Sequence, residues 1–329
     1  MPTTVPTTAP SQGSSASGAP ANAAALAQAT APGLVDINTV ISSEAVEGAA
    51  TGMVLSSSGE ILTNNHVIEG ETSISVTDVG NGKTYGATVV GYDVSHDVAV
   101  IQLTDASGLK TVKVGDSSSV VTGDGVVAVG NAEGSGGTPS YAGGSVTATN
   151  QSITAEDEVN GRSEELSGLI ETNAPIEQGD SGGALVDSSG QVIGMVTAGS
   201  AGFQFQATQG YAIPINQAAA IASQIDAKKS SATVHIGPTA FLGVDVRTPF
   251  SGASGAEIVE AVPGDPAAVA GLVAGDTITQ LAGQPVTSPD SLSTVLLAEA
   301  PGDSVQVQYV NPLGQQEQVT VQLGSGPPQ

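Results

Sequence analysis

The stretch GDSGGALVDSSGQVIGMV, residues 179–196, decides the fold of this 329-residue chain. Two apolar runs, ALV and VIGMV, flank the polar sequence DSSG, and this pattern predicts a β-hairpin. The glycines before the hairpin place Ser181 in a tight turn. Because Gly, Ser and Asp are common in turns, Ser181 is either a nucleophile or a small turn residue. The rest of the chain has to distinguish these two interpretations.

Short apolar runs separated by Gly-rich turns dominate residues 34–222. Hydrophobic residues make up 39% of the chain and aromatic residues only 3%, a composition that favours strands over long helices. The runs lie in GMVLSSSGEILTNNHVI, YGATVVGYD, HDVAVIQL, GDGVVAVGN, GGSVTATNQSI, LSGLIETNAP and QGYAIPI. This spacing predicts a mainly β fold, either barrels or a sandwich, and the number of runs suits two six-stranded barrels joined near 117–124.

The C-terminal third of the chain has a different pattern. NQAAAIASQIDAKKS, residues 216–230, is rich in Ala and predicts a helix. Beyond 230–239 the pattern mixes short strands with two helices, which predicts a second domain of the α+β class. Ser288 and Pro289 suit the N-cap and first position of a helix over 290–299.

Residues 1–33 are rich in Pro, Thr, Ser and Ala. We expect a disordered linker here, because such a composition buries little apolar surface. We also expect an export signal or membrane anchor upstream of this chain, because a linker normally joins two parts. This interpretation places the protein outside the cytoplasm, as an extracellular or cell-envelope protein.

The charge of the chain excludes several functions. Seven Lys and Arg residues stand against 32 Asp and Glu residues, for a formal net charge of −25. Too few basic residues are present to form a surface for nucleic acid or for an anionic membrane. The chain has no cysteine, which excludes thiolate ligands and cysteine nucleophiles. It also has no HExxH motif, so we expect no cofactor and no metal site beyond weak Ca²⁺ binding.

Three histidines, His66, His96 and His235, are the only candidates for a general base that could activate Ser181 near neutral pH. His66 ends the predicted strand EILTNNH, and Asp97 opens the predicted strand DVAVIQL. Both side chains are therefore expected at strand edges, from which they can reach a cleft. The order His, Asp, Ser recurs among catalytic triads on β-barrels.

GDSGG also fits the pattern G-x-S-x-G of the nucleophile elbow in α/β-hydrolases. That elbow requires a helix directly after the serine, with the acid and the histidine further along the chain. Here a hairpin is predicted after Ser181, and only His235 lies downstream. The esterase alternative therefore fails.

Five motifs occur in an order that resembles the HtrA (DegP-like) family of serine proteases, especially its exported actinobacterial members. They are TNNHVI, GYDVSHDVAVIQL, TNAPIEQGDSGGALVDSSGQVIGMVTA, GYAIPI, and FLGV followed by VPGDPAAVAGLVAGDTITQLAGQPV. The resemblance covers roughly 34–325. It implies a chymotrypsin-like double β-barrel over 34–225, a linker over 226–238 and a small PDZ-like α+β domain over 239–325.

The resemblance implies a role for each catalytic position. Ser181 would attack the scissile carbonyl, His66 would take and return its proton, and Asp97 would hold the imidazole and stabilise its charged form. The backbone N–H groups of Gly179 and Ser181 would form the oxyanion hole, for which a glycine at 179 is suited because it tolerates positive φ.

The resemblance also points to the residues that bind substrate. Pro175, six positions before the serine, would line the primary pocket together with Ile176, and neither can pair with a basic side chain. The substrate backbone would pair with Thr197, Ala198 and Gly199. We therefore predict cleavage after small or medium apolar residues.

In the PDZ-like domain, FLGV would bind the C-terminal carboxylate of a peptide, which would add as a strand. The expected contact residues are Phe241, Leu242, Gly243, Val244, Leu292, Val295 and Leu296. Leu292, Val295 and Leu296 could equally be core residues.

Three features depart from the family pattern. Asp180 stands where many members have Asn, and no IVGG-like start is present to supply the partner that this Asp has in trypsin-like relatives. Arg162 lies in the acidic loop EDEVNGRSEEL, which we expect to tune the site. Family trimers use aromatic residues near the start of the protease domain, whereas the first aromatic residue here is Tyr85, so both a trimer and a monomer remain open.

Taken together, these patterns predict a serine endopeptidase that cleaves unfolded or damaged proteins and binds peptide C-termini at its PDZ-like domain. The alternative is a latent protease that acts mainly as a peptide-binding chaperone or sensor.

Overall fold

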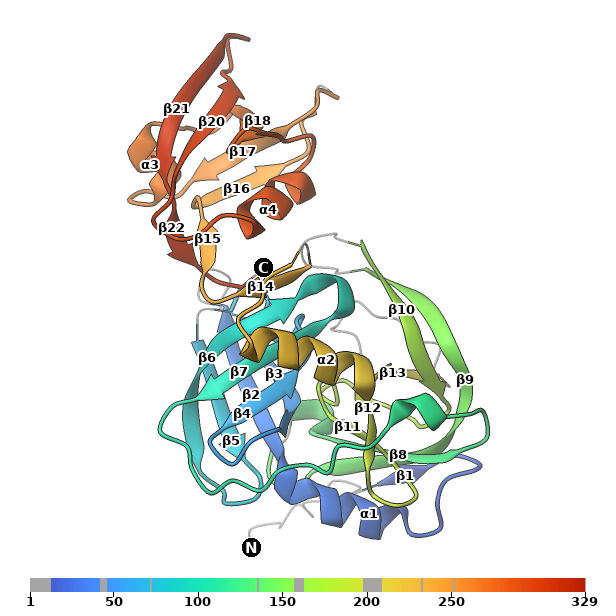
Figure 1. The fold of residues 1–329 in the computed structure, drawn as a ribbon. Helices are drawn as coiled ribbons and strands as arrows, with labels where there is room; N and C mark the ends of the chain where they lie inside the picture. Colours follow the sequence, from blue (N-terminus) through green and yellow to red (C-terminus); the bar gives the residue numbers. More distant parts are fainter. Residues whose placement is uncertain are drawn as a thin grey trace, which may run out of the picture. The chain divides into compact units, whose positions relative to one another are not determined.

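Two units make up the chain, residues 1–229 and 230–329 (Figure 1). A computed structural model describes residues 13–41, 46–71, 73–134, 136–156, 163–197, 209–231, 233–250 and 252–328. The first unit holds two β-barrels, and the second holds a small sheet with two helices. The predicted mainly β architecture of two six-stranded barrels followed by an α+β domain is confirmed.

The first barrel is a closed antiparallel sheet. Its strands are β2 (Leu34–Ile41), β3 (Val46–Val54), β4 (Glu60–Thr63), β5 (Ser73–Asp78), β6 (Thr84–Asp93) and β7 (Val98–Leu103). They follow the order β6-β5-β2-β3-β4-β7, and pairing of β6 with β7 closes the ring. The run Val98 to Ile101 in β7 is fully buried. The short 3₁₀ helix η2 (Val94–His96) lies between β6 and β7.

The second barrel repeats this plan. Its strands are β8 (Gly125–Gly130), β9 (Ser140–Glu156), β10 (Ser163–Thr172), β11 (Ala184–Asp187), β12 (Val192–Val196) and β13 (Gly210–Pro214). They follow the order β9-β10-β13-β12-β11-β8, and β8 pairs with β9. The hairpin predicted from the opening stretch is the β11–β12 pair. Two 3₁₀ helices, η3 (Ser117–Ser119) and η4 (Ala132–Gly134), flank β8.

The segment before the first barrel differs from the expected disordered linker. Residues 13–33 are not a disordered linker, because they contain β1 (Ser14–Ser15), α1 (Ala23–Thr30) and η1 (Ala31–Gly33). β1 pairs with β9, and α1 packs against β8 and β9 with Leu26 buried. A short Ala-rich helix gains most of its stability from such tertiary packing. Residues 1–12 lie outside the described residues.

Helix α2 (Ile215–Asp226) packs against β7 of the first barrel and β12 of the second (Figure 1). Its buried residues recur with a helical period; they are Ile215, Ala218, Ile221, Ala222 and Ile225. The helix ends earlier than the predicted residue 230. Lys228 has a φ of 53°, a left-handed conformation that cannot continue a helix.

The second unit is built around one antiparallel sheet whose strands differ in length. Its path is β16 (Val244–Arg247), β17 (Ala256–Ala261), β18 (Thr277–Leu281), β20 (Ser304–Val310) and β21 (Gln316–Gln322), with β19 (Gln284–Pro285) paired to β18. β15 (Thr239–Phe241) pairs with β22 (Gly324–Gly326), and β14 (Val234–Ile236) precedes them. Helices α3 (Pro266–Ala270) and α4 (Pro289–Leu297) pack on this sheet.

Helix α4 begins as predicted, with Ser288 as N-cap and Pro289 at the first position. The Ser288 hydroxyl accepts a hydrogen bond from the Ser291 N–H at 3.2 Å. The Ser291 hydroxyl in turn accepts one from the Ser288 N–H at 2.9 Å. This reciprocal capping satisfies two backbone donors at the start of the helix.

We predict that Ser288→Ala loosens the first turn of α4 in the full chain, because it leaves one of these N–H groups without its acceptor. Amide hydrogen exchange in that turn should accelerate roughly fivefold, which corresponds to the ~1 kcal/mol typical of a lost N-cap. Thr294→Ala is the control, because the Thr294 hydroxyl donates to the Asp290 carbonyl and caps no N–H group. Equal exchange in both variants would contradict the prediction.

Candidate active site

Strand pairing in the first barrel brings His66 and Asp97 together. β4 and β7 are antiparallel neighbours, with Thr63 opposite Ala99. The chain therefore leaves β4 toward His66 at the same edge at which it enters β7 from Asp97. His66 lies three residues beyond the end of β4, in a turn rather than at the strand end that the sequence predicts.

The carboxylate of Asp97 contacts both the backbone N–H and the imidazole ring of His66. The Asp97 Oδ1 atom accepts from the His66 backbone N–H at 3.0 Å, and both carboxylate oxygens lie 3.0 Å from His66 Nδ1. With Nδ1–H donating to the carboxylate, Nε2 is left as the basic nitrogen. Asp97 is 3% exposed and has a φ of 52°, which Asp tolerates better than most residues.

Two further side chains fix Asp97. The Thr197 hydroxyl donates to Asp97 Oδ2 at 3.0 Å, and the Asn64 side-chain amide donates to the Asp97 carbonyl at 3.0 Å. Both residues are buried. Thr197 is also one of the residues expected to pair with the substrate backbone, and that expectation stays a prediction.

The Ser181 turn is held from both barrels. Ser181 is 4% exposed, and its carbonyl accepts from the Thr51 N–H of β3 at 2.9 Å. The neighbouring Gly182 N–H donates to the Val196 carbonyl of β12 at 2.9 Å. The side chain of Thr51 adds two more bonds, because its hydroxyl donates to the Gly179 carbonyl and accepts from the Asn131 N–H, both at 2.8 Å.

The turn needs glycine at two positions. Gly179 and Gly182 have φ values of 96° and 79°, in the region that residues with a Cβ atom rarely adopt. A Cβ atom at Gly179 would also collide with the carbonyl oxygen of Asn131, and one at Gly182 with the carbonyl oxygen of Thr51. The backbone of this turn therefore requires the glycines at 179 and 182.

Ser181 and His66 open onto a common cleft of about 130 Å³. The cleft is bounded by β2, β3, the turn after His66 and the Ser181 turn. Its lining residues are Thr39, Gly48, Ala49, Ala50, His66, Val67, Glu71, Gln178, Gly179 and Ser181. The structure thus unites the three residues that the sequence singles out as a triad.

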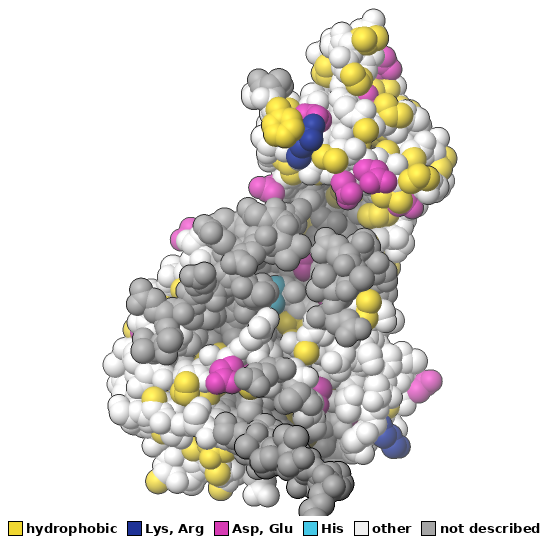
Figure 2. All heavy atoms as spheres, turned by 180° about the vertical axis from the view of Figure 1, so that it is seen from behind, with side chains coloured by type: hydrophobic (Ala, Val, Ile, Leu, Met, Phe, Trp, Pro, Cys, Tyr) yellow, Lys and Arg dark blue, Asp and Glu magenta, His cyan; other side chains and the backbone are white. Residues whose placement is uncertain are grey.

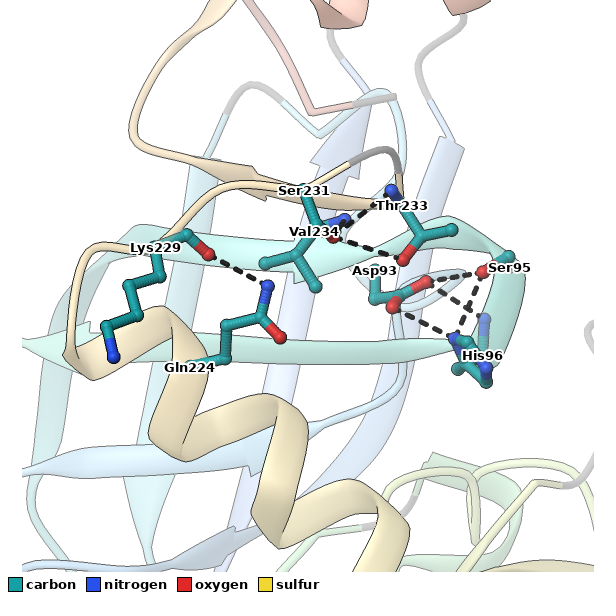
Figure 3. Close-up of polar contacts among 8 residues, drawn as sticks. All are labelled: Asp93, Ser95, His96, Gln224, Lys229, Ser231, Thr233 and Val234. Atoms are coloured by element: carbon teal, nitrogen blue, oxygen red, sulfur yellow. Dashed lines mark hydrogen bonds and ion pairs between the residues drawn. The ribbon is translucent and has the colours of Figure 1, made fainter.

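The other two histidines have different surroundings. His96 Nδ1 lies 2.9 Å from Asp93 Oδ2, and the Ser95 hydroxyl contacts both residues (Figure 3). His235 contacts the Leu297 and Pro238 carbonyls within the second unit. Of the three histidines, only His66 lines the cleft with Ser181.

Comparisons with known proteins agree with this geometry. Residues 50–195 match the trypsin-like peptidase domain, and residues 240–323 match the PDZ domain. Serine protease PepD of Mycobacterium tuberculosis is 33% identical over 317 residues, which are 91% of this chain and 65% of PepD. The periplasmic pH-dependent serine endoprotease DegQ of Escherichia coli is 32% identical over 274 residues, 79% of this chain and 56% of DegQ.

A solved structure extends the similarity to both units. The HtrA-type protease AlgW with tripeptide has a TM-score of 0.52 and 28% identity, and the match covers 93% of this chain and 98% of that chain. The chain belongs to the HtrA family. It spans between about half and two thirds of the length of the two curated relatives.

The structure describes only some of the residues that the sequence predicts to bind substrate. Pro175 is half-buried, and Ile176 packs against the core of the second barrel. Ala198 and Gly199 lie outside the described residues, as does Arg162. The predicted preference for apolar residues before the cut therefore stays a prediction.

Some of the residues predicted to bind a peptide in the PDZ domain are buried in its core, and others are partly exposed. Leu242 is 1% exposed, and Gly243 has a φ of 73° at the turn into β16. Leu292 and Leu296 are 2% and 6% exposed and belong to the hydrophobic core of the second unit, whereas Val295 is only partly buried against it. Of the three helix residues, Val295 has the most surface left for a peptide. Phe241 and Val244 are half-buried at the ends of β15 and β16.

The surface agrees with the acidic composition. On the face drawn in Figure 2, Lys and Arg side chains are scarce and acidic side chains are scattered. Among the described residues, no group of three or more His, Asp or Glu side chains is arranged to hold a metal ion. No helix of the described part is long and apolar enough to cross a membrane.

Asp180 is the one carboxyl group inside the Ser181 turn. Its Oδ2 atom accepts from the Glu177 N–H at 3.0 Å, whereas the buried Oδ1 atom has no hydrogen-bond partner. Burial raises the pKa of Asp180 to about 7, the Glu177 hydrogen bond opposes that rise, and the Glu177 charge adds to it. The carboxyl is therefore protonated at mildly acidic pH and ionised, at a cost in free energy, in alkaline solution.

This pKa predicts the pH dependence of stability. Between pH 4 and pH 7 the folded state binds a proton at Asp180 that the unfolded state has lost, so the free energy of unfolding decreases as the pH rises, by up to about 1.4 kcal/mol per pH unit. Asp180→Asn should flatten this slope in urea titrations at pH 5, 6, 7 and 8. Part of the slope should remain, because the pKa of Glu71 is raised in the same direction. Parallel pH profiles for the variant and the wild type would rule out Asp180 as a source.

Proposed function

We propose that the chain is a serine endopeptidase with Ser181, His66 and Asp97 as its catalytic triad. The observation that carries this proposal is the pairing of Asp97 with His66 Nδ1 beside a serine that opens onto the same cleft. Nε2 is then the nitrogen available to accept the Ser181 proton.

The proposed reaction proceeds through an acyl-enzyme. Ser181 Oγ attacks the scissile carbonyl while His66 Nε2 takes its proton, and the imidazolium is stabilised by Asp97. The protonated His66 then donates to the leaving amine, and a water molecule repeats the sequence on the ester. The side chains of Thr197 and Asn64 are proposed to position Asp97, because both donate hydrogen bonds to it.

The N–H groups of Gly179 and Ser181 are the proposed donors of the oxyanion hole. The support is the backbone of the turn, which combines positive φ at Gly179 with anchoring by Thr51 on one side and Val196 on the other. Donors held in place before the reaction stabilise the developing negative charge without reorganisation.

The proposed substrates are unfolded proteins cut after small or medium apolar residues, with Pro175 and Ile176 lining the primary pocket. Peptide C-termini are the proposed ligands of the PDZ domain. Periplasmic relatives such as DegQ support a location outside the cytoplasm.

The direct test compares wild type and Ser181→Ala with a fluorophosphonate probe and an unfolded protein substrate. The wild type should become covalently labelled and should cleave the substrate, and both signals should vanish in the variant. A folded wild type that neither labels nor cleaves, even with added C-terminal peptides, would favour the latent peptide-binding alternative.

Thr51→Val tests the support of the turn. The substitution keeps the shape of the side chain but removes the donor to the Gly179 carbonyl, so we expect kcat to fall about tenfold to a hundredfold through a misplaced oxyanion hole. Thr63→Val is the matched control, because the Thr63 hydroxyl donates to the Thr51 carbonyl and not to the turn. Similar losses in both variants would mean that Thr51 serves only the stability of the barrel.

A further inference from the structure

The catalytic description leaves the one carboxyl side chain among the described lining residues of the cleft without a role. Glu71 lines the cleft with His66 and Ser181, yet it belongs neither to the triad nor to the turn. It lies at the end of the turn that follows His66, where its backbone N–H donates to the Ile68 carbonyl at 3.2 Å.

The carboxyl group of Glu71 is incompletely satisfied. One oxygen accepts a hydrogen bond from the Thr39 side chain, and the other, Oε2, is buried without a hydrogen-bond partner. A buried acceptor with no donor costs free energy that a ligand can recover by supplying the donor. Burial raises the pKa of Glu71 to about 7, and the Thr39 hydrogen bond opposes that rise.

Apart from His66, the described residues that line the cleft with Glu71 have no side chain that can carry a positive charge. Thr39 of β2, the segment 48–50 of β3 and Gln178 carry no charge, and His66 is the one other titratable side chain among the described lining residues. Glu69, on the same turn, is also acidic. A basic side chain of the substrate could supply the positive charge that these described residues lack.

The position of the cleft indicates which part of the substrate would reach Glu71. Apart from the Ser181 turn with Gln178, its walls are β2, β3 and the turn after His66, which belong to the first barrel. The residues proposed to bind the acyl side, Pro175, Ile176 and Thr197, are not among its described lining residues. His66 protonates the leaving amine, so the chain after the scissile bond departs on the His66 side.

We propose that Glu71 makes the leaving-group side of the cleft selective for Lys or Arg as the first residue after the scissile bond. A long basic side chain would donate to Oε2 while its stem lies along Val67 and the small residues of β3. This inference rests on the proposed protease function, and it concerns a different pocket from the one proposed before the cut.

The test uses quenched fluorescent peptides that all have valine directly before the scissile bond. They differ only in the residue directly after it, which is Lys, Arg, norleucine or Glu. At pH 8 the wild type should have a kcat/KM about tenfold or more higher for Lys or Arg than for norleucine, as expected of a charged hydrogen bond. The peptide with Glu should be the poorest substrate, because it would face a like charge.

Glu71→Gln should abolish this preference, and the ratio of the Lys and norleucine peptides within each variant is the quantity to compare. Glu69→Gln is the matched control, because it removes the same charge from the same turn at a residue that does not line the cleft. It should keep the wild-type ratio. A labelled, active wild type without the preference, or a preference that survives in Glu71→Gln, would overturn the proposal.

The pH dependence of the ratio gives an independent readout. The ratio should increase from pH 6 to pH 8, because the Glu71 carboxyl ionises on rising through about 7. Titration of His66 affects both peptides equally and cancels in the ratio. Fluorophosphonate labelling separates the two possible failures, since a wild type without labelling contradicts the protease function itself, whereas labelling without the preference contradicts only the role of Glu71.

Discussion

Thr51 makes the connection on which the site depends. It is a residue of the first barrel that is 1% exposed, yet it makes three hydrogen bonds to the second barrel, two of them to the Ser181 turn and one to Asn131. Its carbonyl also accepts from Thr63 of β4, the strand that leads to His66. A single threonine therefore links the strand before the general base to the turn that presents the nucleophile. A change in the packing of the two barrels would alter the geometry of the serine and the histidine together.

The aspartate and the serine are positioned by different means. Asp97 is fixed by the His66 backbone and the Asn64 side chain of its own barrel and by the Thr197 hydroxyl, which follows β12 of the second barrel. It adopts a left-handed conformation between η2 and β7. The serine is fixed by backbone bonds from β3 and β12, with glycines that leave room for the approaching carbonyl groups. Such a turn needs few specific side chains, which explains why its sequence consists mainly of glycine.

The sequence allowed the fold and the candidate triad to be predicted because both depend on local patterns. Turn residues between apolar runs indicate the hairpins, and Ser288 followed by Pro289 indicates the start of α4. The roles of Thr51, Asn131 and Glu71 could not be predicted, because a Thr in a strand or a Glu in a turn has no local signature. Helix α1 was missed for a similar reason: the packing of Leu26, and not composition, gives it its place. The burial of Leu292 and Leu296 likewise depends on how α4 packs on the sheet.

The shortage of basic residues shapes the electrostatics of the site. With only seven Lys and Arg residues in the chain, each buried carboxyl must be satisfied by hydrogen-bond donors or must hold its own proton. Asp97 follows the first course, because it accepts from the His66 backbone, the His66 ring and the Thr197 hydroxyl. Asp180 and Glu71 follow the second, since each keeps one oxygen without a partner and each has a raised pKa. The same scarcity, which leaves Glu71 without a Lys or Arg partner among the described residues, makes a basic substrate residue its most favourable ligand.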